Sequence, residues 1–578
     1  MVNEFMSGRY AAGRQKKDWK SGAKKLAIFL VAAAFVLFNV LELKPSYQNT
    51  PISQHRDDFL VDGDDGNNTR TPAIGEKTNL SLADGDLELE RSPYSPPPVV
   101  LPDGGGFEPK RSPYSEIIQL SPPPPVVVSG DEMDDVSSCF TCSSCPVVGP
   151  RKRKRNRTVE ILSISDMDDR LVRSRTAGNA VSNSTIPPRW PSPVDQDLRN
   201  AKAKIAKAPI ITDDPELYGP VFRNLSAFKR SYELMEKILK VYVYKEGDGD
   251  IFRNPVITGI YASEGWFMNQ MLHSRKYLVG DPSKAHLFYV PFGSVNARFK
   301  LYIPNSHSRK NIIAYLDDYV KLISSQNPFW NRTCGADHFV AGCHDWAAAE
   351  TDYSLKPAMR ALCTADIKLG FDIGKDVSLP ATRIISKRKP QLNIGGKPAK
   401  KRTTLAFFAG QMHGYLRPIL IKHWENKDPD MVITGPIPHR LGKKSTANSA
   451  AYQKNPYLYY MKNSKYCLCP RGSQVWSTRI MESIYFGCVP VIISDNFVPP
   501  LFEVLNWPEF AVMVPEKNVP ELKQVLTEIP TQRYMELERG VREVRKHFLW
   551  NRKPVKYDLF HMILHSLWSN RLNQINLD

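Results

Sequence analysis

The sequence lacks the short motifs that identify several large enzyme classes. It contains no G-x-x-x-x-G-K-[ST] loop, no G-x-G-x-x-G after a predicted strand, no H-E-x-x-H and no G-x-S-x-G. These absences argue against a P-loop NTPase, a dinucleotide-dependent dehydrogenase, a zincin and an α/β-hydrolase. The 578 residues also exclude a miniprotein, and the length is enough for about three or four domains.

Clusters of metal ligands are also scarce. Cys139, Cys142 and Cys145 form C-x-x-C-x-x-C, but no fourth Cys or His lies at ligand spacing, which disfavours zinc. Two D-x-D triplets, at residues 248–250 and 428–430, could in principle hold a divalent cation. The first directly follows a predicted strand and the second contains a proline, so we predict solvated loops. We therefore expect no metal ion and no cofactor.

The positive charge of the chain is unevenly distributed. The net charge of +18 divides into +4 for residues 1–43, −10 for residues 44–150 and +24 for residues 151–578. A basic excess of this size favours anionic partners, which include nucleic acid, a membrane surface, a sugar nucleotide and an acidic polysaccharide. The compartment of the protein decides among them.

Residues 26–41, LAIFLVAAAFVLFNVL, form a long uncharged run that follows seven Lys and Arg residues. This pattern predicts a cytosolic tail at residues 1–25, a transmembrane signal anchor at 26–43 and a luminal remainder. The alternatives are a buried core helix and a cleaved signal peptide, but no small-residue cleavage site follows the run. Six N-x-[ST] sequons beyond the run fit a luminal chain.

Residues 44–215 are rich in Pro, Ser, Asp and Gly and show little apolar periodicity. We predict an extended, disordered stem there. The pentapeptide RSPYS occurs at residues 91–95 and again at 111–115, and each copy is followed by a proline run typical of polyproline II. The basic run RKRKRNR at residues 151–157 would suggest a nuclear signal in a soluble protein, but behind a membrane anchor we expect no nucleic-acid binding.

The rest of the chain alternates short apolar runs with amphipathic stretches. Predicted strands lie at residues 240–244, 286–291, 338–343, 405–409, 431–434, 466–470, 489–494 and 511–514. Predicted helices lie at residues 266–272, 312–323, 417–424, 478–486, 519–528, 533–548 and 557–572. This order indicates the α/β class with parallel sheets. We expect two Rossmann-like domains with a cleft between them, at 216–400 and 401–530, and C-terminal helices at 531–578 that pack on the body.

The segment YCLCPRGSQVWSTRIMESIYFG carries the strongest chemical signal. A strand ends in Pro-Arg-Gly, and a loop then leads into a helix whose first turn contains Ser477, Thr478 and Arg479. Free N–H groups at a helix start bind anions, and Arg471 and Arg479 can hold phosphate oxygens bidentately, so the segment predicts a diphosphate site. Glu482, one turn later, can accept from a ribose diol. The alternative is a capped helix with a surface arginine and an exposed glutamate.

Together with PVFRNLSAFKRSYELMEKILKVYVYKEG, DPSKAHLFYVPF, GADHFVAGCHDWA and LAFFAGQMHG, this segment resembles the exostosin-like glycosyltransferases, in their plant branch of Golgi cell-wall enzymes. The resemblance covers about residues 216–530. It implies the GT-B architecture, with the acceptor bound mainly by the first domain and a UDP-sugar mainly by the second, and inversion at the anomeric carbon without an obligatory metal. It assigns Arg471, Arg479 and Glu482 to the donor site, and Arg417 is a further candidate for the phosphates.

An inverting transfer also needs a general base for the acceptor hydroxyl. GT-B enzymes generally take this base from the first domain, which leaves Asp345, His344 and Glu264 as candidates. Asp345 and His344 directly follow a predicted strand, whose carboxyl end faces the cleft. Glu264 lies just before a predicted helix that it can cap. We select Asp345, with a buried His-Asp contact as the alternative.

The resemblance predicts a Golgi type II membrane protein that transfers a sugar to a matrix polysaccharide such as pectin or hemicellulose. The closest-looking branch includes pectin xylosyltransferases, so UDP-xylose and galacturonan are the specific expectation. The basic residues of 386–402, between the two domains, lie where an anionic acceptor would cross, although the basic excess can instead aid solubility or contact the membrane. Two alternatives remain: a non-catalytic luminal partner in a glycosyltransferase complex, and a membrane-tethered polyanion-binding protein.

Overall fold

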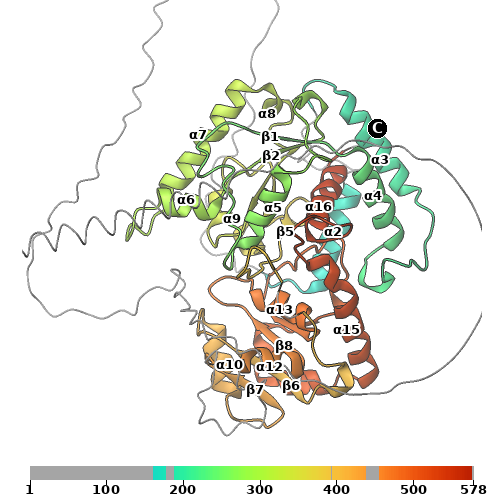
Figure 1. Ribbon diagram of the computed structural model, residues 1–578, viewed down its shortest axis with the longest axis vertical. Coiled ribbons are helices and arrows are strands. Elements are labelled where there is room, and N and C mark those ends of the chain that lie inside the picture. Colours follow the sequence, from blue (N-terminus) through green and yellow to red (C-terminus); the bar gives the residue numbers. More distant parts are fainter. Residues whose placement is uncertain (1–159, 178–187, 392–393, 438–454, 576–578) are drawn as a thin grey trace, which may run out of the picture. The chain divides into compact units, whose positions relative to one another are not determined.

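The computed structural model describes four stretches of the chain (Figure 1), namely residues 160–177, 188–391, 394–437 and 455–575. All of them belong to the second of two compact units, residues 132–578. The predicted cytosolic tail, the membrane anchor and most of the predicted stem lie outside the described residues. Within those stretches, no helix is both long and apolar enough to cross a bilayer.

The first sheet contains five parallel strands in the order β1-β2-β3-β4-β5. They are β1 (Val241–Val243), β2 (Leu287–Val290), β3 (His338–Gly342), β4 (Met359–Leu362) and β5 (Val377–Ser378). The first three confirm predicted strands, whereas β4 and β5 were not predicted. Nearly all of their residues are buried, as expected of a parallel sheet covered on both faces.

Helices cover both faces of this sheet. They are α4 (Leu225–Ile238), α5 (Ala262–Leu272), α6 (Ser294–Leu301), α7 (Lys310–Gln326), α8 (Pro328–Thr333) and α9 (Ala347–Glu350). Successive strand residues point to opposite faces, so Phe288 belongs to one core cluster with Leu316 of α7, while Tyr289 belongs to the other with Phe267 of α5. The carboxyl edge of the sheet is therefore left for the loops that carry polar residues.

The second sheet also contains five parallel strands, in the order β10-β9-β8-β6-β7. Its elements are β6 (Thr404–Ala409), α10 (Leu416–Trp424), β7 (Met431–Thr434), α12 (Pro456–Asn463), β8 (Ser464–Pro470), α13 (Thr478–Phe486), β9 (Val489–Ile493), β10 (Val512–Met513) and α14 (Leu522–Thr527). Strand β6 pairs with β7 on one side and with β8 on the other, so the strand order reverses between β6 and β8. In open α/β sheets, ligands bind outside the carboxyl ends of the strands at such a reversal.

The two C-terminal helices lie where the chain returns to the first sheet. Helix α15 (Thr531–Val544) packs on α13 and β9, and α16 (Leu559–Asn573) packs on α4, α5, β4 and β5. Helix α16 is buried on nearly all sides, and the carboxylate of Asp558 caps its start by accepting from the backbone N–H of His561. The C-terminal helices thus pack on the body, as predicted.

Two helices correct the predicted disordered stem. Helices α2 (Ile164–Ala177) and α3 (Pro193–Ala206) fall within residues 44–215, yet Met167, Leu171 and Leu198 are buried in the main core. Their apolar residues recur at helical spacing, but they are few and are diluted by charged residues. Ion pairs, including that of Asp195 with Arg332, also hold these helices on the body. The stem prediction is therefore wrong for these two segments.

Within the part of the chain that the structure describes, two disulfides lie at the sheets. Cys343–Cys363 joins the residues that directly follow β3 and β4, and Cys467–Cys488 joins β8 to the residue before β9. Cys469 is buried and free. Because Cys343 immediately precedes two of the predicted catalytic residues, the first disulfide holds the start of their loop.

Candidate functional site

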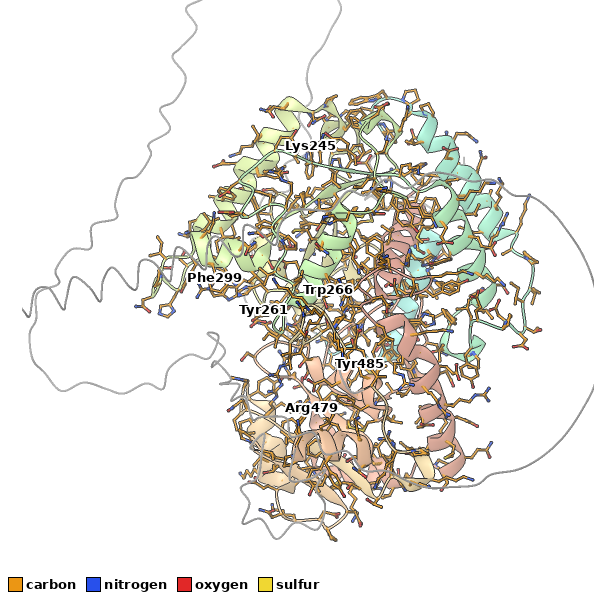
Figure 2. All side chains as sticks on the ribbon, viewed as in Figure 1. Lys245, Tyr261, Trp266, Phe299, Arg479 and Tyr485 are labelled. Carbon is orange, nitrogen blue, oxygen red and sulfur yellow. A yellow bond between two sulfur atoms is a disulfide. The ribbon has the colours of Figure 1, made fainter. Side chains whose placement is uncertain are left out.

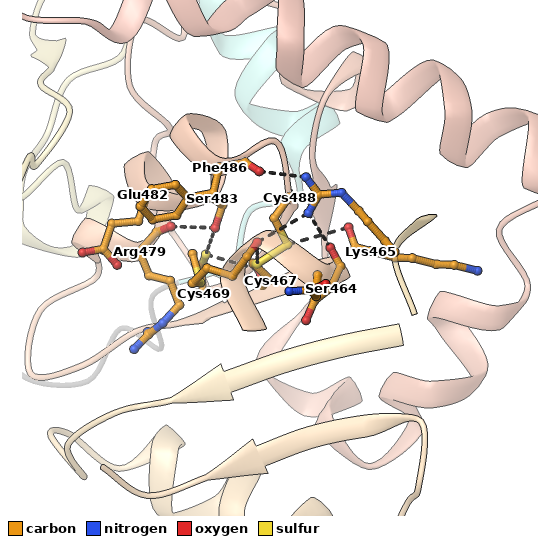
Figure 3. The surroundings of a disulfide bond; sticks show 12 residues. Ser464, Lys465, Cys467, Cys469, Arg479, Glu482, Ser483, Phe486 and Cys488 are labelled. Atoms are coloured by element: carbon orange, nitrogen blue, oxygen red, sulfur yellow. Dashed lines mark hydrogen bonds between the residues drawn. A yellow bond between two sulfur atoms is a disulfide. The ribbon is translucent and has the colours of Figure 1, made fainter. Parts of the chain in front are cut away.

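Arg479, in the first turn of α13, lies at the reversal point of the second sheet. It is 7% exposed, and its Nη2 donates to the carbonyl of Ala409 at the end of β6, 2.7 Å away. The guanidinium carbon also lies 4.6 Å from the centre of the Phe408 ring. Figure 3 shows the guanidinium pointing away from the Cys467–Cys488 disulfide.

The rest of this guanidinium is buried beside the hydroxyl of Tyr457. Among the described residues, neither Nε nor Nη1 of Arg479 has an acceptor in good hydrogen-bond geometry. Burial lowers the pKa of Arg479, but nearby Tyr457, Cys469 and Glu482 outweigh it and raise the pKa, so the side chain stays charged. A buried cation with two unused donors is a site for an anion that brings its own oxygens.

Arg417 adds a second positive charge to the same place. Its Nη1 donates to the carbonyl of Gln411, 3.0 Å away, and its Nε is also buried without an acceptor among the described residues. Burial, helped by the charge of Arg479, lowers the pKa of Arg417 to about 10, which still leaves it protonated at neutral pH. The two like charges lie close together, so an anion between them would relieve their repulsion.

Arg471 is arranged differently from the other two arginines. It follows β8 directly, and its Nη1 lies 3.5 Å from a carboxylate oxygen of Glu516. The same carboxylate accepts from the backbone N–H of Asp495 and from the hydroxyl of Tyr415. The positive charge of Arg471 is thus already balanced, so the structure brings Arg471 to the site but gives it less freedom to bind phosphate than Arg479 has.

The two hydroxyl residues at the start of α13 differ in their contacts. Ser477 is the N-cap, and its Oγ accepts from the backbone N–H of Arg479 at 3.3 Å, while Thr478 is partly exposed. Glu482 is partly buried and accepts from the hydroxyl of Tyr457 on α12 at 2.5 Å. The hydroxyl of Ser477 is therefore occupied in capping the helix, and the hydroxyl of Tyr457 holds Glu482 in place one turn from Arg479.

Glu264 is buried inside the first domain. It is 3% exposed, and its Oε2 accepts from the backbone N–H of Cys343, 2.7 Å away, and from the hydroxyl of Ser294. Burial raises the pKa of Glu264 to about 7. Its contacts tie α5 to the end of β3 and to the start of α6, so the carboxylate positions the loop after β3 rather than facing a substrate.

His344 and Asp345 occupy that loop. Burial, together with the charge of Arg298, lowers the pKa of His344 to about 4, so its ring is neutral. Burial raises the pKa of Asp345 to about 6, against a hydrogen bond with Tyr261. Asp345 is partly exposed, and its Oδ1 has no partner among the described residues. Of the three predicted candidates, Asp345 is therefore the carboxylate with an oxygen left to take a proton.

Two aromatic residues that we did not predict, Tyr261 and Trp476, connect the start of α13 with the loop after β3. The ring of Tyr261 lies 5.0 Å from that of His344 and 5.8 Å from that of Trp476, which precedes α13. Trp476 also donates from Nε1 to the hydroxyl of Thr364, just after β4, at 3.2 Å. Figure 2 labels Tyr261 and Arg479 on the two parts of the chain. The residues before α13 and the loop after β3 thus lie close together. The sequence could have indicated this proximity only through the aromatic residues in these loops.

The D-x-D triplets form turns whose carboxylates pair with lysines. Asp248 Oδ1 accepts from the backbone N–H of Asp250, and Lys300 pairs with both carboxylates. Residues 428–430 repeat the turn, and there Lys523 pairs with both carboxylates. This geometry agrees with the loop interpretation. Across the described residues, no group of three or more His, Cys, Asp or Glu side chains could hold a metal ion.

Two parallel α/β sheets, with two buried arginines at the strand reversal of the second, are consistent with a Rossmann-like glycosyltransferase. Residues 235–529, about half of the chain, match the Exostosin GT47 domain. The chain therefore belongs to the exostosin GT47 family of glycosyltransferases, as the sequence motifs predicted.

Named relatives from plants agree with this assignment. The probable glycosyltransferase At3g07620 of Arabidopsis thaliana is 40% identical over 394 residues, which cover 66% of this chain and 81% of the relative. The probable beta-1,4-xylosyltransferase IRX10 of the same plant is 29% identical, covering 57% and 81%. The probable glucuronosyltransferase GUT1 of Oryza sativa subsp. japonica is 27% identical, covering 57% and 80%.

Proposed function

We propose that this protein transfers a sugar, with inversion, from a UDP-sugar to a matrix polysaccharide of the plant cell wall. The observation that carries the proposal is Arg479, whose buried guanidinium has two unused donors at the strand reversal of the second sheet. A diphosphate supplies the oxygens that these donors lack. The GT-B arrangement follows as part of the proposal, with the donor at the second sheet and the acceptor at the first.

The proposed reaction forms one bond and breaks one at the anomeric carbon, and it moves one proton from the acceptor to the enzyme. The acceptor hydroxyl loses its proton to the free oxygen of Asp345 while its oxygen bonds to the anomeric carbon of the donor. The bond from that carbon to the diphosphate breaks, and UDP leaves with the electron pair. Arg479, Arg417 and the N–H groups at the start of α13 stabilise the negative charge that develops there. Glu482 accepts from the ribose of the donor.

UDP-xylose is the donor that we propose. One relative is named a probable beta-1,4-xylosyltransferase, but others are named probable glucuronosyltransferases, so UDP-glucuronate is the main competitor. A single pocket contact can separate these sugars. The test is a screen in which the purified full-length protein, in detergent, receives each UDP-sugar and released UDP is measured. Fastest turnover of UDP-xylose supports the choice, and preference for another sugar contradicts it.

The same screen tests the enzyme against its two alternatives. A non-catalytic partner in a complex would bind UDP or nothing and release no product with any donor, with or without acceptor. A membrane-tethered polyanion-binding protein would bind acidic polysaccharide and be insensitive to replacement of Arg479. We propose that the reaction needs no metal, so treatment with EDTA should leave the rate unchanged, and complete loss of activity would contradict this.

The location that we propose is the Golgi membrane, as a single-pass type II protein with a luminal catalytic region. Support comes from the uncharged run at residues 26–41 and its basic flank. Protease added to intact Golgi vesicles should leave the C-terminal half of the chain whole until detergent is added. Digestion without detergent would contradict the topology.

An anionic polysaccharide such as galacturonan is the acceptor class that we propose. Support comes from the net charge of +24 over residues 151–578 and from exposed side chains in the connection between the sheets, namely Lys387, Arg388, Lys389, Lys397, Lys400 and Lys401. Arg402, in the same segment, does not contribute because it is buried and donates to the carbonyls of Ser464 and Phe486. Salt should weaken acceptor binding, and equal, salt-independent binding of neutral xylan would contradict an anionic acceptor.

A further inference from the structure

A row of aromatic rings runs from the end of α6 to the residues before α13. It consists of Tyr302, Trp346, His344, Tyr261 and Trp476, and we call it the aromatic row. Successive ring centres are 4.9, 5.1, 5.0 and 5.8 Å apart. All five side chains are partly exposed. Tyr261 and Trp476 pack against one core cluster, and Tyr302 and Trp346 pack against the other, so the row rests on the core and reaches solvent with part of each ring.

The row passes the two sets of residues assigned to the reaction. Asp345, the proposed base, lies between His344 and Trp346 in the chain, and Trp476 directly precedes Ser477, the N-cap of the helix that carries Arg479. One end of the row therefore lies near the donor residues, and its middle lies at the base. Its other end, at Tyr302, extends away from both.

Two arginines flank this outer end. The guanidinium carbon of Arg298 lies 4.2 Å from the ring centre of Tyr302 and 5.1 Å from that of Trp346, and that of Arg309 lies 5.9 Å from Trp346. Among the described residues, neither arginine forms a hydrogen bond or ion pair through its side chain. The carboxyl of Glu350 is buried without a hydrogen bond among those residues. Burial and the charge of Glu264 raise its pKa to about 8, against the charges of Arg309 and Arg298, which lower it. Both guanidinium groups keep their N–H donors available for the carboxylate of a ligand.

We propose that the aromatic row binds the acceptor chain and that Arg298 and Arg309 select uronate residues in it, an inference that rests on the proposed function. The C–H faces of pyranose rings are apolar and can cover aromatic rings, while the guanidinium groups bind the carboxylates bidentately. This assignment names the part of the surface that recognises an acidic polysaccharide: the loop after β3 and the end of α6. In this proposal, the exposed Lys and Arg side chains of the connection between the sheets attract the polymer electrostatically but do not select its residues.

The test measures binding of the full-length protein to oligogalacturonide, which is acidic, and to xylo-oligosaccharide, which is neutral, by affinity electrophoresis or calorimetry. Trp346→Ala should weaken both by about tenfold or more, and Trp346→Phe, which keeps a ring, should recover much of the loss. The double variant Arg298→Gln, Arg309→Gln should reduce oligogalacturonide binding by about tenfold and leave xylo-oligosaccharide binding unchanged.

Matched controls use exposed residues of the same types elsewhere. Trp190→Ala removes an indole that is 37% exposed, and Arg552→Gln, Lys553→Gln removes two exposed charges before α16. Both should bind like the unmodified chain. The inference is overturned if the Trp346 and arginine variants bind both glycans normally, or if the control charges matter equally.

UDP binding, measured on the same samples, separates this inference from the proposed function. All variants should bind UDP with unchanged affinity because none of the replaced side chains contacts the arginine pair. A chain that binds no UDP but loses oligogalacturonide when Arg298 and Arg309 are replaced would refute the donor site and keep the aromatic row. A chain that binds UDP but is indifferent to these replacements would refute the row alone.

Discussion

At the scale of single residues, the chemistry depends on side chains that the fold leaves without partners. Arg479 keeps two buried donors, and Asp345 keeps one free carboxylate oxygen, among the described residues. Burying unpaired polar groups costs stability, so their retention marks positions where a ligand is expected to complete the contacts. Glu264 and Ser477 have ordinary partners instead and stabilise the loops that carry the others.

We expect replacement of Arg479 to impair the transfer much more than the fold. Arg479→Ala removes the main donor to the leaving diphosphate and should lower kcat/KM by roughly a hundredfold to a thousandfold. Arg479→Lys keeps the charge but not the fork of donors and should recover only part of the rate. Steady-state kinetics with UDP-sugar and acceptor measure both, with exposed Arg552→Ala as the control. A folded Arg479→Ala protein within a few-fold of the unmodified rate would rule out this role.

The proposed base predicts a definite pH dependence. Asp345 must be ionised to accept a proton, and burial raises its pKa to about 6, so kcat/KM should fall as the pH drops below about 6. Asp345→Asn should remove most of the activity and abolish this acidic limb. His344→Asn should leave the limb in place because His344 is already neutral, with its pKa lowered to about 4. A limb that persists in a residual-activity Asp345→Asn enzyme would assign the base elsewhere.

At the scale of elements, longer strands with plain apolar patterns were predictable, whereas β4, which carries a charge, and β5, which has only two residues, were not. Strand β4 contains Arg360, which is 1% exposed and would normally argue against a buried strand. Its guanidinium pairs with Asp376 at 2.6 Å and donates to the carbonyl of Gly370 at 2.7 Å. Those partners come from residues ten or more positions away, so local pattern could not reveal them. The same reason explains α3, whose Asp195 pairs with distant Arg332.

Gly414 lets two loops of the proposed donor site approach each other closely. Its φ is +73°, and a Cβ there would lie 2.2 Å from the carbonyl oxygen of Gly472, beside Arg471. We expect Gly414→Ala to separate the loops that carry Arg417 and Arg471, to weaken UDP binding severalfold and to destabilise the protein by about 1–3 kcal/mol. Calorimetry with UDP and thermal unfolding measure these effects. Gly435→Ala is the control, because nothing lies within 4 Å of its added Cβ, and equal behaviour of both variants would contradict the argument.

At the scale of the whole folded body, the C-terminal helices bring the end of the chain back onto the first sheet. Helix α15 packs beside the second sheet, and α16 then packs on the first sheet between helices from the beginning of the body. Residues far apart in sequence therefore meet, as when the imidazole of His565 on α16 pairs with the hydroxyl of Ser231 on α4 at 3.0 Å. Stability of the first sheet thus depends on the last residues of the chain.

Two buried histidines at this closure should make the body sensitive to acid. Burial lowers the pKa of His547 and of His565 to about 3, from an ordinary value of 6.5. The unfolded chain therefore binds these protons first, so stability is full above pH 6.5 and is lost as the pH falls toward 3. Each histidine should cost about 2 kcal/mol of unfolding free energy between pH 7 and pH 5.

Urea unfolding at both pH values measures this loss. His565→Gln, which keeps a polar group beside Ser231, should reduce the pH dependence by about half, whereas replacement of the exposed His423 should not change it. The argument fails if the pH dependence of the His565→Gln variant equals that of the unmodified chain.

The sequence by itself determined the α/β class and the family, and it pointed to the segment that we propose for the donor. These conclusions depend on the order of neighbouring residues. Short stretches of sequence suffice to recognise an apolar run of strand length, a loop before a helix, or an Arg one turn from a Glu. The predicted strands at 240–244 and 466–470 follow from that order, whereas the proximity of Arg417 to Arg479, 62 residues apart, comes from the fold.

Only the tertiary structure decided which of the predicted residues are free to act. Partnering depends on residues distant in the chain: Ser294 and Cys343 occupy Glu264, Glu516 balances Arg471, and nothing described occupies the free oxygen of Asp345. The aromatic row likewise combines rings from loops more than two hundred residues apart, at Tyr261 and Trp476. Contacts across such separations depend on the packing of the sheets, which no local pattern of residues encodes.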